Sequence, residues 1–371
     1  MKRVRVSELV PGLRTAEDVY SFNNQLIVER GTVLDDSTIA RLEYYSVLSV
    51  RVEEDEEVGS VPNATQSYTE DFSKMSDNLS YSQKIKATRQ FLEFQKHFTA
   101  NSEALKGHLN DIIENNSINT GVLLQSVTNL ISKGTTSIGM FDMLHSMRSY
   151  DDLTYVHSMS VSLICNIFGR WLNLNEEDLR VLTLAGLLHD IGKLAIPESI
   201  IKKPSKLTND EYKKVKQHTV EGYKLLKNLP IDDRIKDAAL LHHERCDGTG
   251  YPLSITGEKV SDFAKIVAIA DVYDAMTAAR VYRGPMCPFK VISIFEEEGL
   301  QKYDSAYILM FLQHIGQTYL NNRVRLNDGR IGDIVLIHNN SVSRPLIKCL
   351  DGTVVDLDKV NRNQLYIEEL V

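Results

Sequence analysis

Apolar residues recur at helical spacing over much of this chain, and the longest such run extends from about residue 145 to residue 320. One helix in this run, LRVLTLAGLLHD, is apolar on its buried side until it ends at His189 and Asp190. Another begins at Thr208, because Glu211 three residues later can complete a capping box. We expect its buried face to continue through Tyr212, Val215, Leu225 and Leu226. The run predicts an all-helical domain.

A different pattern precedes this domain. Residues 1–58 alternate short apolar stretches with turn signals, which predicts a small α+β module. One short helix fits within it, with Asp35, Asp36 and Ser37 as candidate caps. Residues 59–82 are acidic and polar, and their composition predicts a linker.

Helical spacing returns after the linker. Residues 83–144 are interpreted as a helical connector, and its faces carry Ile85, Phe91, Leu92 and Phe98. This connector either packs on its own domain or pairs with the same helices of a second copy in a homodimer.

The end of the chain alternates β-branched runs with Asp-Gly turns. RVRL-NDG-RIGDIVLI and LIKCL-DG-TVVDLD predict a small antiparallel β unit over residues 321–371. A sheet of this size is not stable alone, so it is expected to cap the helical domain. The fold class expected is therefore mainly α: a helical domain over 145–320 with a small N-terminal α+β module and a small C-terminal β subdomain.

Composition narrows the class of protein. The chain has 371 residues, of which 43% are hydrophobic and 25% charged, which excludes pervasive disorder and fibrous repeats. The net charge of -8 argues against duplex nucleic acid as a partner. No secretory signal and no apolar run of about 18 residues is present, which predicts a cytoplasmic protein with no membrane partner. The four cysteines are widely spaced and predict unpaired thiols.

The histidines carry the candidate chemistry. Five of the ten lie between residues 157 and 243 of the helical region, at His157, His189, His218, His242 and His243, with acidic residues beside several of them. A single histidine near an apolar face is more often a hydrogen-bonded core residue than a ligand. Imidazole and carboxylate groups together, however, suit iron, manganese, nickel or zinc.

Two adjacent pairs favour the metal interpretation. His189 and Asp190 end an apolar helix, so their burial requires a partner that offsets the cost of desolvation. His242 and His243 end IKDAALLHHE and run into a loop rich in glycine. Neighbouring helical residues point about 100° apart, so two adjacent histidines are most easily used together at a helix end. These pairs favour a binuclear site.

Several motifs together resemble a known family. HDIGK at 189–193 and HHERCDGTGYP at 242–252 are similar to the two signatures of HD-GYP domains, a branch of the HD-domain metal-dependent phosphohydrolases. The resemblance extends to IPESIIKKPSKLTNDEYKKVKQH, to ADVYDAMTAARVYR and to TYVHS, in family order over about residues 145–320.

The resemblance implies a role for individual residues. One metal would be held by His157, His189, Asp190 and Asp271. The second would be held by His218, His242 and His243, with Asp190 bridging both. Lys193 would lie beside the bridging solvent and act with Asp190 in catalysis. Substrate would be bound by Lys193, Arg280, Arg283, Asp274 and the loop residues Gly250, Tyr251 and Pro252.

The activity implied is hydrolysis of cyclic di-GMP. Two divalent ions, with iron or manganese as the expected metals, would lower the pKa of solvent held between them. The resulting hydroxide would attack phosphorus in line with the leaving oxygen, while Lys193, Arg280 and Arg283 stabilise charge on the phosphate.

Two departures from the family pattern affect the expected product. Family members with a third metal use a glutamate four residues before the first histidine, and here that position is Leu153. On a helix, the nearby Asp151 and Asp152 point away from that direction. We therefore expect two metals and linear pGpG as the main product. Ala278 and Ala279 replace a more usual serine and aspartate, which affects substrate contacts.

Two other functions are compatible with the sequence, and a third fits it less well. Some family members prefer cyclic GMP-AMP, and base recognition depends on details of the pocket. A non-catalytic sensor of cyclic dinucleotides, with a diguanylate cyclase as a candidate partner, belongs to a different class. Such proteins usually lose ligands or the GYP loop, and this chain keeps both. A nucleotidase of the wider HD superfamily would leave the GYP string unexplained.

Overall fold

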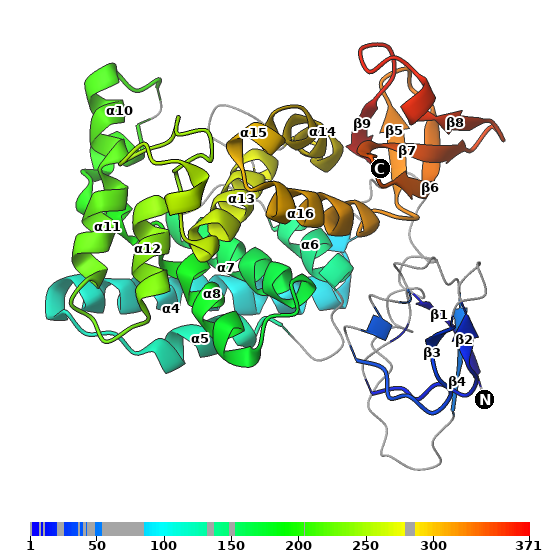
Figure 1. Ribbon diagram of the computed structural model, residues 1–371, viewed down its shortest axis with the longest axis horizontal. Coiled ribbons are helices and arrows are strands. Elements are labelled where there is room, and N and C mark those ends of the chain that lie inside the picture. Colours follow the sequence, from blue (N-terminus) through cyan, green and yellow to red (C-terminus); the bar gives the residue numbers. More distant parts are fainter. Residues whose placement is uncertain are drawn as a thin grey trace. The chain divides into compact units, whose positions relative to one another are not determined.

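The computed structural model (Figure 1) divides into two compact units, 1–79 with 132–140 and 80–131 with 141–371. The finer division at residues 58, 82, 144 and 320 stays a prediction, and the expected linker lies outside the described residues. The structure describes residues 2–6, 9, 12–20, 26–35, 38–39, 42, 49–53, 85–131, 137–147, 153–203, 205–278 and 286–371.

The first unit contains two small antiparallel sheets. Strand β1 (Lys2–Arg5) pairs with β4 (Ser49–Val52), and β2 (Val19–Tyr20) pairs with β3 (Leu26–Val28). Of the three candidate caps, Asp35 accepts a hydrogen bond from the Thr38 amide at 2.7 Å, and the other two lie outside the described residues. The β part of the expected module is therefore present.

Helices form most of the rest of the chain, which confirms the mainly α class. Their bounds are α4 Arg89–Asn115, α5 Thr120–Thr128, α6 Ser137–Ser146, α7 Leu153–Trp171, α8 Glu176–Leu188, α9 Glu198–Ile201, α10 Asn209–Lys216, α11 His218–Leu226, α12 Asp233–Leu241, α13 Asp262–Thr277, α14 Pro288–Ile294, α15 Leu300–Lys302 and α16 Ser305–Gln317. Short 3₁₀ turns η2 (Ile191–Ala195) and η3 (Gly257–Lys259) and a π-helical turn, η4 (Phe295–Gly299), complete the set.

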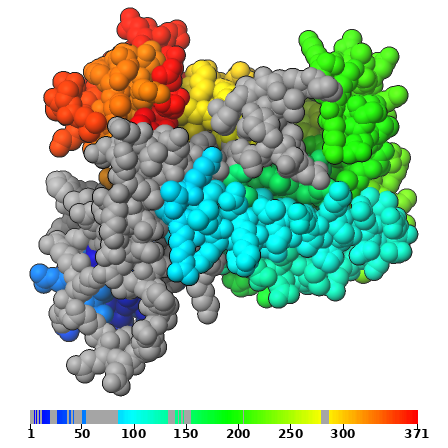
Figure 2. Space-filling view, turned by 180° about the vertical axis from the view of Figure 1, so that it is seen from behind, coloured from blue at the N-terminus to red at the C-terminus, as the bar shows by residue number. Residues whose placement is uncertain are grey.

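Helix α4 packs on α7 and α5, and α5 packs on α8. Phe91 and Phe98 on α4 are buried, whereas Leu92 is 54% exposed. Figure 2 shows α4 and α5, in cyan and blue-green, as a continuous surface. The segment therefore packs on its own domain, and the homodimer stays a prediction.

The helix after Thr208 begins as expected and then departs from the prediction. Thr208 and Glu211 form both hydrogen bonds of the capping box. Tyr212, however, is 50% exposed, so its expected burial is wrong. The helical segment is interrupted at Gln217, and the buried face begins only with His218 on α11. The prediction treated α10 and α11 as one helix with one buried face, and it therefore assigned Tyr212 to that face by mistake.

The C-terminal unit is an antiparallel sheet in the order β8-β7-β6-β5-β9. Its strands are β5 Arg323–Leu326, β6 Ile331–His338, β7 Ser341–Cys349, β8 Val354–Asp356 and β9 Ile367–Leu370, and β8 is followed by the 3₁₀ turn η5 (Leu357–Lys359). Both Asp-Gly turns occur, with Gly329 at φ +89° and Gly352 at φ +86°. The sheet lies close against α16, since a Cβ on Gly316 would be 2.2 Å from Val342.

Candidate metal centre

The ends of several helices bring the predicted ligands together. His189 follows the last residue of α8, and Asp190 precedes the turn η2. The other ligands lie on α11 (His218), at the end of α12 (His242 and His243), on α7 (His157) and on α13 (Asp271). The sequence separates these residues by up to 114 positions, from His157 to Asp271.

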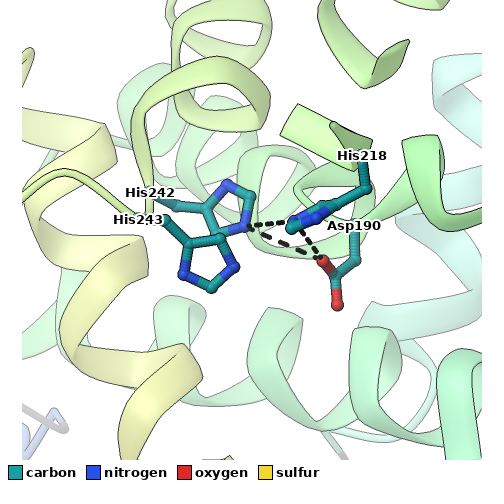
Figure 3. A group of neighbouring side chains, drawn as sticks. All are labelled: Asp190, His218, His242 and His243. Carbon is teal, nitrogen blue, oxygen red and sulfur yellow. Dashed lines mark hydrogen bonds and ion pairs between the residues drawn. The ribbon is translucent and has the colours of Figure 1, made fainter. Parts of the chain in front are cut away.

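One group contains Asp190, His218, His242 and His243, and their candidate ligand atoms all lie within 4.8 Å of one another. Figure 3 shows the rings of His242 and His218 directed toward the Asp190 carboxylate. The Nε2 atom of His218 lies 3.2 Å from Asp190 Oδ1, and that of His242 lies 3.7 Å from the same oxygen. The two Nε2 atoms are 3.3 Å apart.

A second group contains His157, His189 and Asp271. His157 Nε2 lies 3.0 Å from Asp271 Oδ1, and His189 Nε2 lies 3.8 Å from it. Both histidines also approach the other oxygen of Asp190, Oδ2, at 3.5 Å and 3.4 Å. The two oxygens of Asp190 therefore face different groups, which is the geometry of a carboxylate that can bridge two cations.

Backbone carbonyls orient three of the histidine rings. The Nδ1 atoms of His189, His218 and His242 contact the carbonyls of Gly186, Val215 and Ala238 at 2.8, 2.7 and 2.9 Å. Because a carbonyl only accepts, Nδ1 must carry the proton in each ring. In His157 the same atom donates to Asp274 at 2.7 Å. All four rings thus present Nε2 to the centre, as a metal ligand requires.

Burial and missing partners support the same interpretation. His189 and His242 are fully buried, and Asp190 is 1% exposed. His189 Nε2 and Asp190 Oδ1 have no hydrogen-bond partner among the described residues. Buried polar atoms without a partner are costly, and a bound cation would satisfy both. The residues present therefore fit a metal site, and nitrogen and oxygen donors suit transition ions.

The protonation of the ligands differs within the centre. Burial and the neighbouring histidines hold the pKa of His242 well below its ordinary value, and burial lowers the pKa of His243 to about 3. Burial also disfavours charged His189, but Asp190 and Asp271 outweigh it and raise its pKa to about 10. His242 and His243 are thus neutral near pH 7, whereas a cation must displace a proton from His189.

Lys193 lies at the centre as expected. Its ammonium group forms an ion pair with Asp190 Oδ2, the oxygen that faces His157 and His189. Burial disfavours ionised Asp190, but Lys193 and His189 outweigh it and hold the pKa of this carboxyl well below its ordinary value. A lysine in this position can stabilise charge on an anion that reaches the centre.

The loop from Gly250 to Pro252 closes over His243. The Tyr251 ring stacks on the His243 ring, with centroids 4.6 Å apart and planes at 26°. Gly250 is required by space, because a Cβ there would lie 2.4 Å from the Arg245 amide. Tyr251 therefore lies against the centre, whereas a role of Gly250 and Pro252 in binding substrate stays a prediction.

Glu244 is the residue that sequence reasoning missed. It is 3% exposed, and its Oε1 atom accepts hydrogen bonds from the amides of Leu253 and Ser254 at 2.6 and 3.0 Å. Its Oε2 atom accepts from Ile255 at 3.2 Å. Glu244 thus ties the loop to the helix end that carries His242 and His243. Its position directly after two histidines could have marked it as a candidate. The sequence does not show, however, that its carboxylate binds the backbone of residues 253–255.

Some predicted site residues lie outside the described part of the chain. They are Arg280, Arg283, Ala279, Asp151, Asp152 and the side chain of Leu153. Ala278 is described and ends α13. Within the described residues, no helix is both long and apolar enough to cross a membrane.

The fold and the two groups of ligands define a helical domain with a candidate metal centre, and comparison with known proteins shows what this domain is similar to. Residues 135–307 match the family model described as HD domain. This part of the chain is similar to that family, and the expected resemblance to HD-GYP domains is confirmed.

Three relatives are named for activities on cyclic dinucleotides. A cyclic di-GMP phosphodiesterase of Pseudomonas aeruginosa is 36% identical over 203 residues, or 54% of this chain and 49% of that protein. The 3'3'-cGAMP-specific phosphodiesterase 1 of Vibrio cholerae is 38% identical over 162 residues, or 44% and 37%. The cyclic di-GMP phosphodiesterase response regulator RpfG of Xanthomonas campestris is 44% identical over 128 residues, or 33% and 33%. The chain spans half or less of each of these relatives.

Proposed function

We propose that this protein is a metal-dependent phosphodiesterase that hydrolyses cyclic di-GMP, mainly to linear pGpG. The observation that carries the proposal is the position of Asp190, whose two oxygens face separate groups of ligands. Two of the three relatives above bear the name cyclic di-GMP phosphodiesterase, and their similarity supports this substrate.

The centre is proposed to hold two transition ions, iron or manganese, with Asp190 between them. His157, His189 and Asp271 would hold one ion, and His218, His242 and His243 the other. When bound, such a pair supplies a nucleophile near neutral pH and neutralises the phosphate.

The chain's own groups would then position the substrate. Lys193 lies close enough to Asp190 to reach an anion at the centre and to assist the departing 3' oxygen. Asp274 accepts the Nδ1 proton of His157 at 2.7 Å and so orients that ring. Arg280 and Arg283 are proposed to bind phosphate oxygens, as the family resemblance implies.

Product analysis tests this proposal. The purified protein, prepared without oxygen and loaded with iron(II) or manganese, is incubated with cyclic di-GMP, and the products are separated over time. The matched control is the double variant His189→Ala, Asp190→Ala. It removes one histidine of the second group and the carboxylate that faces both groups. Loss of substrate with accumulation of pGpG only in the unaltered protein is expected. Intact cyclic di-GMP in the presence of bound metal would contradict the proposal, and GMP as the main early product would contradict the assignment of pGpG.

Cyclic GMP-AMP is the second candidate substrate. The observation that favours it is the 38% identity to the cGAMP-specific enzyme of Vibrio cholerae. The same assay with both nucleotides in competition ranks them by kcat/KM. A homodimer, a diguanylate cyclase partner and a cytoplasmic location stay predictions from the sequence.

A further inference from the structure

We propose that Lys216 and Tyr212 form a second contact site for the substrate, next to the metal centre, which binds the phosphate remote from the metals and one base. This inference rests on the proposed function and adds two residues to the proposed set. Both lie on α10, the helix that leads into α11 (Figure 1).

Three aromatic rings and one ammonium group lie in a row that begins at the candidate metal ligand His243 and ends at the surface. Tyr251 stacks on His243, as described above. The ammonium group of Lys216 lies 4.8 Å from the centroid of the Tyr251 ring and 4.9 Å from that of Tyr212. Since Tyr212 is 50% exposed, the row ends at the surface. The order is therefore His243, Tyr251, Lys216 and Tyr212.

Among the described residues, the charge of Lys216 has no carboxylate to compensate it. Within the described ranges, no acidic side chain forms an ion pair with its ammonium group, and its contacts are the two tyrosine faces. Its neighbours on the helix differ: Lys213 pairs with Asp210 at 3.7 Å, and Glu211 is bound by Lys203 at 2.6 Å. A cation held over two aromatic faces is oriented, and its remaining hydrogen-bond donors are free to bind an anion.

The chemistry of a cyclic dinucleotide matches this arrangement. The molecule has two phosphodiesters, and a metal centre that cleaves one leaves the charge of the other uncompensated. Lysine binds phosphate as a point charge. Bases stack on aromatic side chains, and an exposed tyrosine beside the lysine offers such a face. Lys216 would bind the second phosphate, and Tyr212 would support a neighbouring base.

Four variants and a control test this inference. Lys216→Met removes the charge, and Lys216→Arg keeps it. Tyr212→Leu removes the ring, and Tyr212→Phe keeps it. The matched control is Lys213→Met, which removes the same charge from the same helix at a position that is 77% exposed. Each metal-loaded protein is titrated with cyclic di-GMP, and its metal content is measured. The titration yields KM and kcat where the nucleotide is hydrolysed and Kd where it stays intact.

The expected results distinguish direct contact with the substrate from structural support of Tyr251. Lys216→Met should raise KM or Kd about tenfold, as expected for a lost charge-assisted hydrogen bond. Tyr212→Leu should raise it about fivefold, as expected for a lost stacking contact. Lys216→Arg and Tyr212→Phe should lose less affinity than Lys216→Met and Tyr212→Leu, and only the Lys213→Met control should stay within about twofold of the unaltered protein, with metal content unchanged throughout.

Three results would overturn the inference. If Lys216→Met behaves like Lys213→Met while the unaltered protein hydrolyses cyclic di-GMP, the inference fails and the proposed function stands. If Lys216→Met lowers metal content or kcat with KM unchanged, Lys216 only supports Tyr251. If the unaltered protein neither binds nor hydrolyses the nucleotide, both proposals fail. Binding without hydrolysis that weakens in Lys216→Met would support the contact and contradict the proposed reaction.

Discussion

Asp274 illustrates how single contacts orient the ligands of the centre. Its Oδ2 atom accepts the Nδ1 proton of His157, which turns Nε2 toward Asp271 and Asp190. Outer contacts of this kind usually contribute about 10- to 100-fold to metal affinity. Asp274 is therefore a positioning residue.

We predict that Asp274→Ala weakens metal binding about 10- to 100-fold and leaves the number of sites unchanged at saturating metal. Metal titration followed by elemental analysis measures both quantities. Asp190→Asn is the comparison, because removal of a bridging carboxylate should reduce the number of ions bound. If both variants bound equally fewer metal ions, Asp274 would not differ from Asp190, and its assignment as a positioning residue would be contradicted.

At the scale of elements, the centre depends on the close approach of η2 and α11. Gly192 allows it: a Cβ there would lie 1.9 Å from the carbonyl oxygen of His218 and 2.4 Å from the amide of Gly222. Backbone atoms cannot move aside as a flexible side chain can. The turn that carries Asp190 and the helix that carries His218 would have to separate.

Gly192→Ala is therefore expected to lower the free energy of unfolding by about 2 kcal/mol or more and to reduce metal binding. Thermal unfolding and metal content are measured together. Gly107→Ala is the control, since Gly107 lies within α4 with no atom within 4 Å of the added Cβ. The Gly107→Ala change should raise the free energy of unfolding by up to about 1 kcal/mol. Normal metal binding in Gly192→Ala would show that the close contact is dispensable.

The capping box of α10 predicts a dependence on pH. Hydrogen bonds from Lys203 and the Thr208 amide lower the pKa of Glu211 to about 2 from its ordinary value of 4.5. Because the folded pKa is the lower one, the charged carboxylate stabilises the helix above about pH 4.5. This contribution is lost as the pH falls toward 2.

Glu211→Gln keeps an acceptor at this position and removes the charge. Hydrogen exchange of the α10 amides in the two proteins should differ most above pH 4.5, with the variant less protected, and the difference should shrink as the pH falls toward 2. A difference that is the same at pH 3 and pH 7 would mean that the charge of Glu211 contributes nothing.

At the scale of the whole molecule, the ligands come from five helical segments that are far apart in the chain. A metal that binds only when these segments are assembled stabilises the folded state by mass action. At 100 times Kd this contribution is about 2.7 kcal/mol, which corresponds to a Tm shift of roughly 5–10 °C for a unit of this size.

Removal of metal by a chelator is accordingly expected to lower Tm by roughly 5–10 °C, and added metal should restore it. Differential scanning calorimetry measures the shift. The variant Asp190→Asn serves as the reference, because it should bind fewer ions and its Tm should therefore change less on either treatment. A Tm that is insensitive to chelation in the unaltered protein would contradict the metal centre itself.

Rules that depend on neighbouring residues, such as helix capping and turn preferences, were sufficient to predict where several helices and turns begin or end. His189, Asp190 and His242 end helices as their sequence context predicts, and Thr208 caps α10. The Asp-Gly turns also occur where expected. These features depend on a few neighbouring residues, so the chain specifies them locally. The error at Tyr212 has the opposite origin, because α10 buries none of its residues and the buried face begins only with His218 on α11.

By itself, then, the sequence determined the residue types of the centre, the helix ends that carry them and the mainly α class, because periodicity, caps and motifs are local properties. Only the tertiary structure decided which oxygen of Asp190 faces which histidines, that Glu244 binds the loop beyond Tyr251, and that Lys216 lies between two tyrosine rings. Those relations depend on packing between helices that the sequence separates, and no local pattern encodes the distances between them.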